Sequence, residues 1–100
     1  MKKNETRKVE CSIKELERFR KKVDEIDDEI ISLLGNRQSM VELIGKIKKR
    51  SGVKILSADR EKQILKRILS KGEKKKIDLD FIDRIYRVIF KNSRKVQRLV

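Results

Sequence analysis

The sequence contains no histidine, one cysteine (Cys11) and only 4% aromatic residues in a length of 100. A lone cysteine cannot form an internal disulfide bond, and no cluster of residues has the spacing of a zinc site, which suits a reducing compartment. The N-terminal segment lacks the apolar part of a signal peptide, and no run of about 18 uncharged apolar residues occurs. We therefore expect a soluble, cytoplasmic protein with no membrane partner.

The missing residue types also limit the chemistry. The sequence contains no histidine, and the polar residues singled out below include no serine with a neighbouring base, no paired carboxylates and no metal-ligand cluster, so neither nucleophilic nor metal catalysis has support. We expect no cofactor and no metal ion. A reaction in this protein would have to proceed by holding and polarising its substrate.

Basic residues are abundant: 29 Lys and Arg stand against 16 Asp and Glu, a formal net charge of +13. Such a surface attracts anions, from nucleic acids to small dianions. The runs KIKKR (46–50) and KGEKKK (71–76) would suit a basic helical nucleic-acid-binding module. However, few aromatic residues are available for base stacking, and no recognition-helix motif is present. We therefore expect no specific nucleic-acid partner.

The apolar periodicity predicts an all-α chain with one long helix and two shorter ones. Residues 1–11 are polar and aperiodic and are expected to form a flexible tail, whereas residues 12–100 form a helical domain. The long helix should run from Ser12 to about Lys49, because its apolar stripe keeps its phase through the interruption at Gly35-Asn36. That stripe consists of Leu16, Phe19, Val23, Ile26, Ile30, Leu33, Met40, Ile44 and Ile47.

Capping residues place the two shorter helices. Ser57 is the expected N-cap of the second helix, and Gly72 is expected to end it after Lys71. The third helix should follow the cap Asp78 and continue to the end of the sequence.

The predicted long helix is too long for a compact domain of this size. It would span about 57 Å, whereas a compact domain of about 100 residues measures roughly 35 Å across. Two shorter helices cannot cover the whole apolar stripe, so a second copy of the chain is the economical source of cover. We expect an intertwined homodimer.

Polar residues interrupt the buried face of each helix. Arg37 and Lys48 fall in the apolar phase of the long helix, and Arg60 and Glu61 do so at the start of the second. On the third helix Ser93 and Gln97 continue the face of Tyr86 and Ile89.

A single such residue would be read as a side chain reaching for water at a helix end. When all three helices contribute, an internal site is the better interpretation, because an unpaired buried charge is costly. Three cations and one carboxylate favour a ligand with about two negative charges and a hydroxyl group.

These residues occur in stretches that resemble the chorismate mutases of the all-helical type, the chorismate mutase type II family. The resemblance extends from about Glu15 to Gln97. It is carried by FRKKVDEIDDEIISLLGNR (19–37), GKIK (45–48), ADREK (58–62) and NSRKVQ (92–97). It implies an isomerase that converts chorismate to prephenate by a concerted Claisen rearrangement. Chorismate carries two carboxylates, an ether oxygen and a ring hydroxyl.

The resemblance also implies roles for individual residues. Arg20 and Arg37 would bind the carboxylates, and Arg60 and Ser93 would support the ring carboxylate. Lys48 and Gln97 would donate hydrogen bonds to the ether oxygen, where negative charge develops. Glu61 would accept from the ring hydroxyl and hold Lys48.

Two positions need separate comment. Arg20 lies 28 residues before Lys48 on the predicted helix, about 42 Å along its axis, and cannot reach its own site. The resemblance implies that it crosses to the partner's site, in agreement with the dimer. Ser57 stands where some family members have aspartate, near the hydroxyl end of the pocket.

A lyase of the same fold, isochorismate-pyruvate lyase, is the nearest alternative to the mutase. It shares the arginine and lysine of the long helix and the late glutamine. The sequence Asp59-Arg60-Glu61 favours the mutase.

Overall fold

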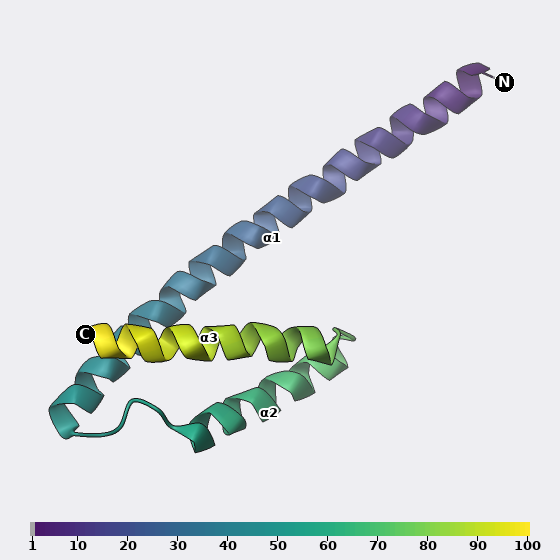
Figure 1. Cartoon of the computed structure of the whole chain (residues 1–100). Helices are drawn as coiled ribbons and strands as arrows, with labels where there is room; N and C mark the ends of the chain where they lie inside the picture. The colour runs from purple at the N-terminus through teal and green to yellow at the C-terminus, as the bar shows by residue number, and fades with distance from the viewer. Residues whose placement is uncertain (1) are drawn as a thin grey trace. The chain divides into compact units, whose positions relative to one another are not determined.

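The computed structural model describes residues 2–100, with the side chains of residues 5–100. Three α-helices follow one another, α1 (Lys2–Ser51), α2 (Ala58–Lys74) and α3 (Leu79–Leu99), and residues 2–100 contain no strand (Figure 1). The predicted all-α class, with one long and two shorter helices, is confirmed. In the described part of the chain, no helix is both long enough and apolar enough to cross a membrane.

The chain divides into two units, one that ends at Asn36 and one that comprises Arg37–Val100. The described residues of the first unit all belong to α1. The second unit contains the remainder of α1 together with α2 and α3. Every site residue predicted from the sequence except Arg20 therefore lies in the second unit.

Helix α1 begins earlier than the sequence indicated. The predicted start at Ser12 is wrong, because the helix already includes Lys2, and Glu5 supplies an acidic residue in its first turn. No proline or glycine interrupts residues 2–34, so helical structure can propagate. Met1 lies outside the described residues, and the flexibility of residues 1–11 stays a prediction.

The continuity of α1 through Gly35-Asn36 is confirmed. The helix ends where Gly52 adopts a left-handed conformation, with φ of 70°. The amide of Val53 then donates to the carbonyl of Lys48 at 3.0 Å, which closes the last turn. Basic residues in that turn interact favourably with the helix dipole.

Helix α2 has the predicted beginning but not the predicted end. The Ser57 side chain accepts a hydrogen bond from the amide of Arg60 at 3.3 Å, so the predicted N-cap is confirmed. The predicted end at Lys71 is wrong, since α2 continues to Lys74. A lysine, Lys76, takes the left-handed position with φ of 59°, and the amide of Ile77 donates to the carbonyl of Gly72 at 3.0 Å.

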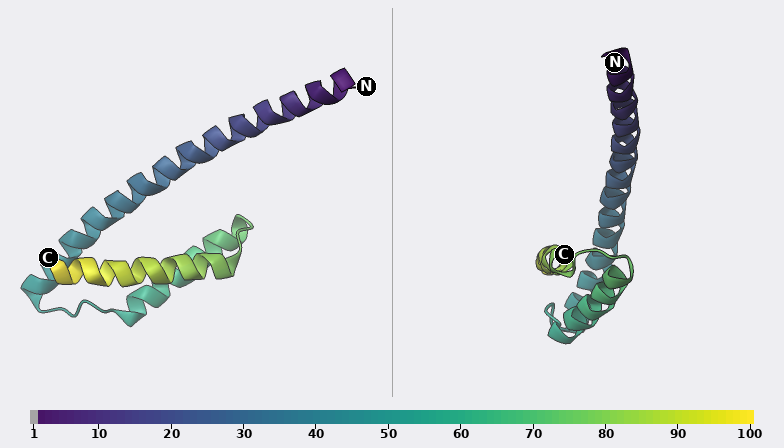
Figure 2. Two further views of the ribbon diagram at one scale, coloured as in Figure 1. Left: turned by 45° about the horizontal axis from the view of Figure 1, so that its top comes forward. Right: turned by 90° about the vertical axis from the view of Figure 1, so that its right-hand side faces the viewer.

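Gly72 is instead a helix-packing position. It is buried, and a methyl group added to it would collide with the Ile82 side chain of α3. Helix α3 begins at the predicted cap, because the Asp78 carboxylate accepts from the amide of Asp80 at 3.0 Å. Ile82 and Phe90 are buried on α3, and the two views of Figure 2 agree with Figure 1 that α2 and α3 lie side by side in opposite directions.

Gly45 brings α3 close to the C-terminal part of α1 within the second unit. A Cβ atom on Gly45 would lie 2.9 Å from Gln97 Cα and 2.6 Å from Val100 Cγ2. Real carbon atoms make contacts of about 3.5–4.0 Å. The two helix backbones can therefore approach this closely only because residue 45 has no side chain.

All nine residues of the predicted apolar stripe are exposed in the single chain. Val41 is buried on α1, whereas the large apolar side chains that precede it on the helix are at least 42% exposed. The exposed stripe residues are Leu16, Phe19, Val23, Ile26, Ile30, Leu33, Met40, Ile44 and Ile47.

Candidate active site

A hydrogen bond between α1 and α3 forms the first part of the site. The Arg37 guanidinium donates to Ser93 Oγ at 2.5 Å, and Ser93 Oγ in turn donates to the carbonyl of Ile89 at 2.8 Å. Ser93 is buried and Arg37 is half-buried. Arg37 and Ser93 are thus brought together, as the sequence predicted for polar residues facing the interior.

Gln97 lies one turn further along α3. Its Nε2 donates to the carbonyl of Ser93 at 3.2 Å. Its Oε1 is buried and has no hydrogen-bond partner in the protein. A buried acceptor without a partner destabilises a fold and is often retained for function. Gly45 fixes this part of α3 against α1, because it lies directly beside the Gln97 backbone.

Lys48 is half-buried near the end of α1, but its partner differs from the predicted one. Its Nζ donates to the carbonyl of Ile55 at 2.8 Å. The expectation that Glu61 holds Lys48 is wrong in this structure. The left-handed turn at Gly52 reverses the chain, so a backbone carbonyl of the following connection comes within reach of the ammonium group.

Glu61 pairs with Arg94 of α3, a residue that the sequence reasoning missed. One guanidinium nitrogen of Arg94 lies 2.7 Å from each carboxylate oxygen of Glu61. The side chains of Arg94 and Glu61 are 28% and 24% exposed. A signal was available, because Arg94 follows Ser93 and precedes Gln97 by three residues, so it borders the same helical face.

Arg60 and Arg20 are not brought to these residues. Arg60 is exposed in the first turn of α2, where it donates to Gln63 Oε1 at 2.9 Å. The prediction that it lies on the buried face is wrong in the single chain, and its role with a substrate stays a prediction. Arg20 belongs to the first unit, where it is exposed and pairs with Glu17 at 3.3 Å. The Ser57 hydroxyl is engaged as the N-cap of α2.

The candidate site residues lie within the part of the chain that matches a known protein family. The family model described as chorismate mutase type II matches residues 19–98. This chain belongs to that family. The matched range includes every candidate residue, among them Arg20 near its beginning and Gln97 near its end.

Several individual proteins named as chorismate mutases are similar in sequence to this chain. The chorismate mutase of Methanocaldococcus jannaschii is 30% identical over 86 residues, which is 86% of this chain and 87% of that protein. The bifunctional chorismate mutase/prephenate dehydratase of Escherichia coli K12 is 28% identical over 75% of this chain and 19% of its own length. That of Aquifex aeolicus is 39% identical over 57% of this chain and 16% of its own length. The chain thus matches nearly all of the first relative but a small part of each bifunctional one.

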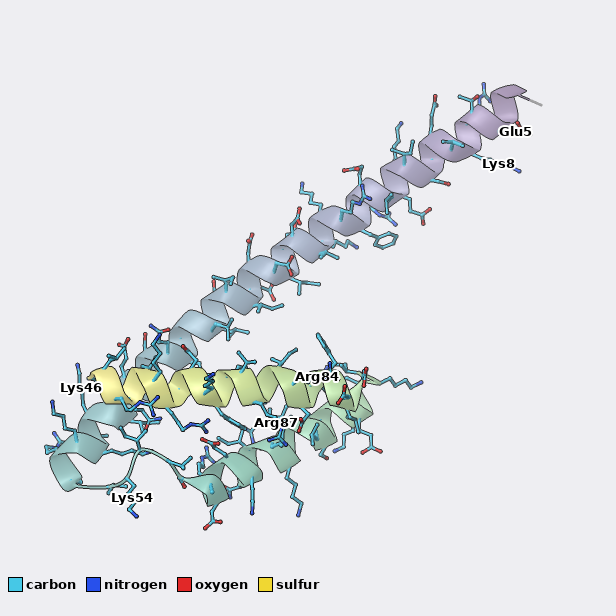
Figure 3. The ribbon with its side chains drawn as sticks, viewed as in Figure 1. Glu5, Lys8, Lys46, Lys54, Arg84 and Arg87 are labelled. Carbon is cyan, nitrogen blue, oxygen red and sulfur yellow. The ribbon has the colours of Figure 1, made fainter. Side chains whose placement is uncertain are left out.

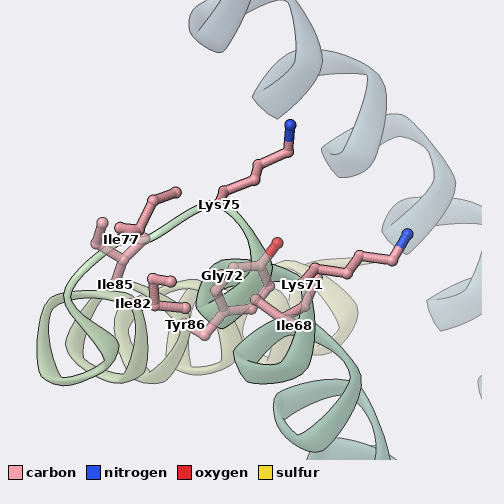
Figure 4. A pocket seen from close by; sticks show the side chains of 8 residues that line it. All are labelled: Ile68, Lys71, Gly72, Lys75, Ile77, Ile82, Ile85 and Tyr86. Atoms are coloured by element: carbon pink, nitrogen blue, oxygen red, sulfur yellow. The ribbon is translucent and has the colours of Figure 1, made fainter.

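This chorismate mutase type II chain also has an apolar cavity away from the polar residues. A hollow of about 230 Å³ lies between the end of α2 and the start of α3. Figure 4 shows three isoleucines, Ile77, Ile82 and Ile85, on one side of it, with Lys71 and Lys75 extending away. Its lining offers few hydrogen-bonding groups for a dianion, so it does not compete with the polar cluster as the candidate active site.

In residues 5–100, no group of three or more His, Cys, Asp or Glu side chains comes together as metal ligands. The partly buried charged groups among the candidate residues are Arg37, Lys48, Arg94 and Glu61. Their sum favours an anion. Each cation also keeps N–H groups that its protein partner does not use, because a guanidinium has five and an ammonium has three.

Proposed function

We propose that the chain catalyses the rearrangement of chorismate to prephenate. The observation that carries the proposal is the hydrogen-bonded series of Arg37, Ser93 and Gln97 across α1 and α3, within the residues that the family model matches. Lys48 and Glu61 add a donor and an acceptor from the end of α1 and the start of α2. This set of groups can hold a dianion that bears a hydroxyl.

The reaction needs no proton transfer. Within one molecule the ether C–O bond breaks as a new C–C bond forms, and negative charge grows on the ether oxygen in the transition state. Donors aimed at that oxygen lower the barrier, because they bind the transition state more tightly than the substrate. Lys48 and Gln97 are these donors in our proposal.

The observed hydrogen bonds leave the necessary donors available. Gln97 Nε2 carries two N–H groups and gives one to Ser93, so the second can reach the ether oxygen. Lys48 gives one of three N–H groups to Ile55. Arg37 uses one nitrogen for Ser93, and its other N–H groups can bind a carboxylate in a bidentate manner. Arg60 and Ser93 support the ring carboxylate in our proposal, for which Ser93 must turn its single O–H away from the carbonyl of Ile89. Ser57 lies near the hydroxyl end.

The active enzyme is a homodimer in our proposal. The stripe residues Phe19, Val23 and Ile26 are 48%, 54% and 54% exposed, and the described residues of the first unit include no second element that could cover them. A second copy of the chain covers the stripe, and burial of each of these half-exposed side chains contributes on the order of 1 kcal/mol. Arg20 then binds a substrate carboxylate in the partner's site, because 28 residues of continuous α1 separate it from Lys48. A cytoplasmic location stays a prediction from the sequence.

The decisive experiment is a spectrophotometric assay of chorismate loss with the wild type and Lys48→Ala. Removing a donor to the developing oxyanion should lower kcat by about 10² to 10³. Lys46→Ala is the matched control, because Lys46 is an exposed lysine on the same helix (Figure 3). No activity in the wild type, or equal activity in the wild type and Lys48→Ala, would refute the proposal. Prephenate as the product excludes the lyase alternative, which would form salicylate and pyruvate.

A further inference from the structure

The ion pair between Arg94 and Glu61 differs from the others in the described residues. It joins two helices and is mostly buried, with side chains that are 28% and 24% exposed. The remaining pairs each connect neighbouring turns of one helix, and most of their side chains are exposed. They are Arg20–Glu17, Arg84–Asp80 and Arg87–Asp83.

The geometry of this pair restricts the Glu61 carboxylate. A single nitrogen of Arg94 lies 2.7 Å from both oxygens, so the carboxylate is held symmetrically about that nitrogen. A charge-assisted contact of this length is among the stronger hydrogen bonds in proteins. A carboxylate offers about four acceptor positions, so Glu61 can still accept a further hydrogen bond.

We propose that Arg94 is a positioning residue, which orients Glu61 to accept the hydrogen bond from the ring hydroxyl of chorismate. This inference depends on the proposed function, in which Glu61 binds that hydroxyl. Arg94 belongs to α3 and Glu61 to the first turn of α2. The pair therefore also fixes the position of the Glu61 carboxylate relative to Ser93 and Gln97 of α3. Without Arg94 the carboxylate can rotate among several positions, and the ring hydroxyl loses a fixed acceptor.

The inference distinguishes two kinds of substrate. An analogue of chorismate with hydrogen in place of the ring hydroxyl makes no use of the Glu61 acceptor. Arg94→Gln should therefore lower kcat/KM for chorismate by roughly ten- to hundredfold, mostly through a higher KM. With the analogue the same substitution should change kcat/KM by less than about threefold.

Three further variants control the experiment. Arg94→Lys keeps the charge and should restore part of the chorismate activity. Glu61→Gln, like Arg94→Gln, should lower kcat/KM for chorismate much more than for the analogue. The double variant should have nearly the same kcat/KM for chorismate as either single variant. Arg84→Gln removes an arginine of an exposed pair on the same helix and should leave both substrates unaffected.

Thermal melting and the binding of both compounds to each variant complete the test. If Arg94→Gln folds poorly, Arg94→Lys and Glu61→Gln are used instead to compare kcat/KM for the two substrates. An equal loss with chorismate and the analogue would overturn the inference, because Arg94 would then act on a carboxylate or on the fold. No loss with chorismate would overturn it as well. A wild type that neither binds nor converts chorismate would refute the proposed function and this inference together.

Discussion

Substituting Gly45 by alanine tests how closely α1 and α3 must approach for catalysis. The added Cβ would lie 2.9 Å from Gln97 Cα and 3.2 Å from Gln97 Cβ. An ordinary carbon–carbon contact needs about 3.5 Å or more, so the Gln97 backbone has to move by about 0.6 Å. The Val100 side chain, at 2.6 Å, also has to move, but the end of a side chain can do so more easily.

Gly45→Ala should lower kcat clearly, whereas its free energy of unfolding should change only moderately. A misplacement of about 1 Å can cost about 10²-fold in rate, so we expect kcat of Gly45→Ala to fall by about tenfold to a hundredfold. Overpacking destabilises by about 1–3 kcal/mol, and the higher helix propensity of alanine offsets about 1 kcal/mol of that. Chorismate turnover and thermal melting measure the two effects separately.

Gly35→Ala is the matched control, because a Cβ there would have no heavy atom within 4 Å. It should leave kcat unchanged and stabilise the helix by about 1 kcal/mol. If Gly45 acts by placing Gln97, the double variant Gly45→Ala/Gln97→Ala should be about as slow as Gln97→Ala alone. A Gly45→Ala enzyme with the wild-type kcat would refute the reasoning.

Three other predictions concern Gln97, Lys76 and Arg20. Gln97→Glu should make kcat fall with rising pH while the wild type stays flat, because only a protonated glutamic acid can donate to the ether oxygen; a pH profile with the wild-type shape would contradict this role. Lys76→Gly should raise the free energy of unfolding by about 1 kcal/mol in urea denaturation, since a non-glycine residue is strained at φ of 59°. Mixing the inactive variants Arg20→Ala and Lys48→Ala should restore up to about a quarter of the wild-type activity, because half of the reassembled dimers contain one intact site. No recovery after confirmed subunit exchange would contradict an active site in which Arg20 and Lys48 come from different chains.

The features that the sequence predicted correctly depend on nearby residues. The side chains of Ser57 and Asp78 cap the first turns of their own helices, and neither cap requires knowledge of the remaining fold. The passage of α1 through Gly35 could be predicted because the apolar stripe keeps its phase there. Family membership was predicted from the same stretches that the family model matches.

The features that were missed depend on contacts between distant parts of the sequence. Gly72 has the residue type of a helix end, but the packing of Ile82 against it requires a glycine inside the helix. Lys48 was assigned to Glu61 by resemblance, whereas the reversal after Gly52 brings the carbonyl of Ile55 closer. The position of Arg94 beside Ser93 made it a candidate partner of Glu61, but the sequence could not select it among the basic residues of α3 before the packing of α2 on α3 was known.

The net charge of the partly buried candidate residues can be compared with the one expected from the sequence. The sequence assigned Arg37, Lys48 and Arg60 to the interior with Glu61 as the carboxylate. In the structure Arg60 is exposed and Arg94 pairs with Glu61, so three partly buried cations and one carboxylate again leave an excess of two positive charges, before Arg60 and the partner's Arg20 of our proposal are counted. An excess of positive charge among these partly buried side chains favours a ligand with negative charge, such as the two carboxylates of the proposed substrate. The expectation of a dianionic ligand therefore depends on the balance of charge among these residues rather than on the identity of any one arginine.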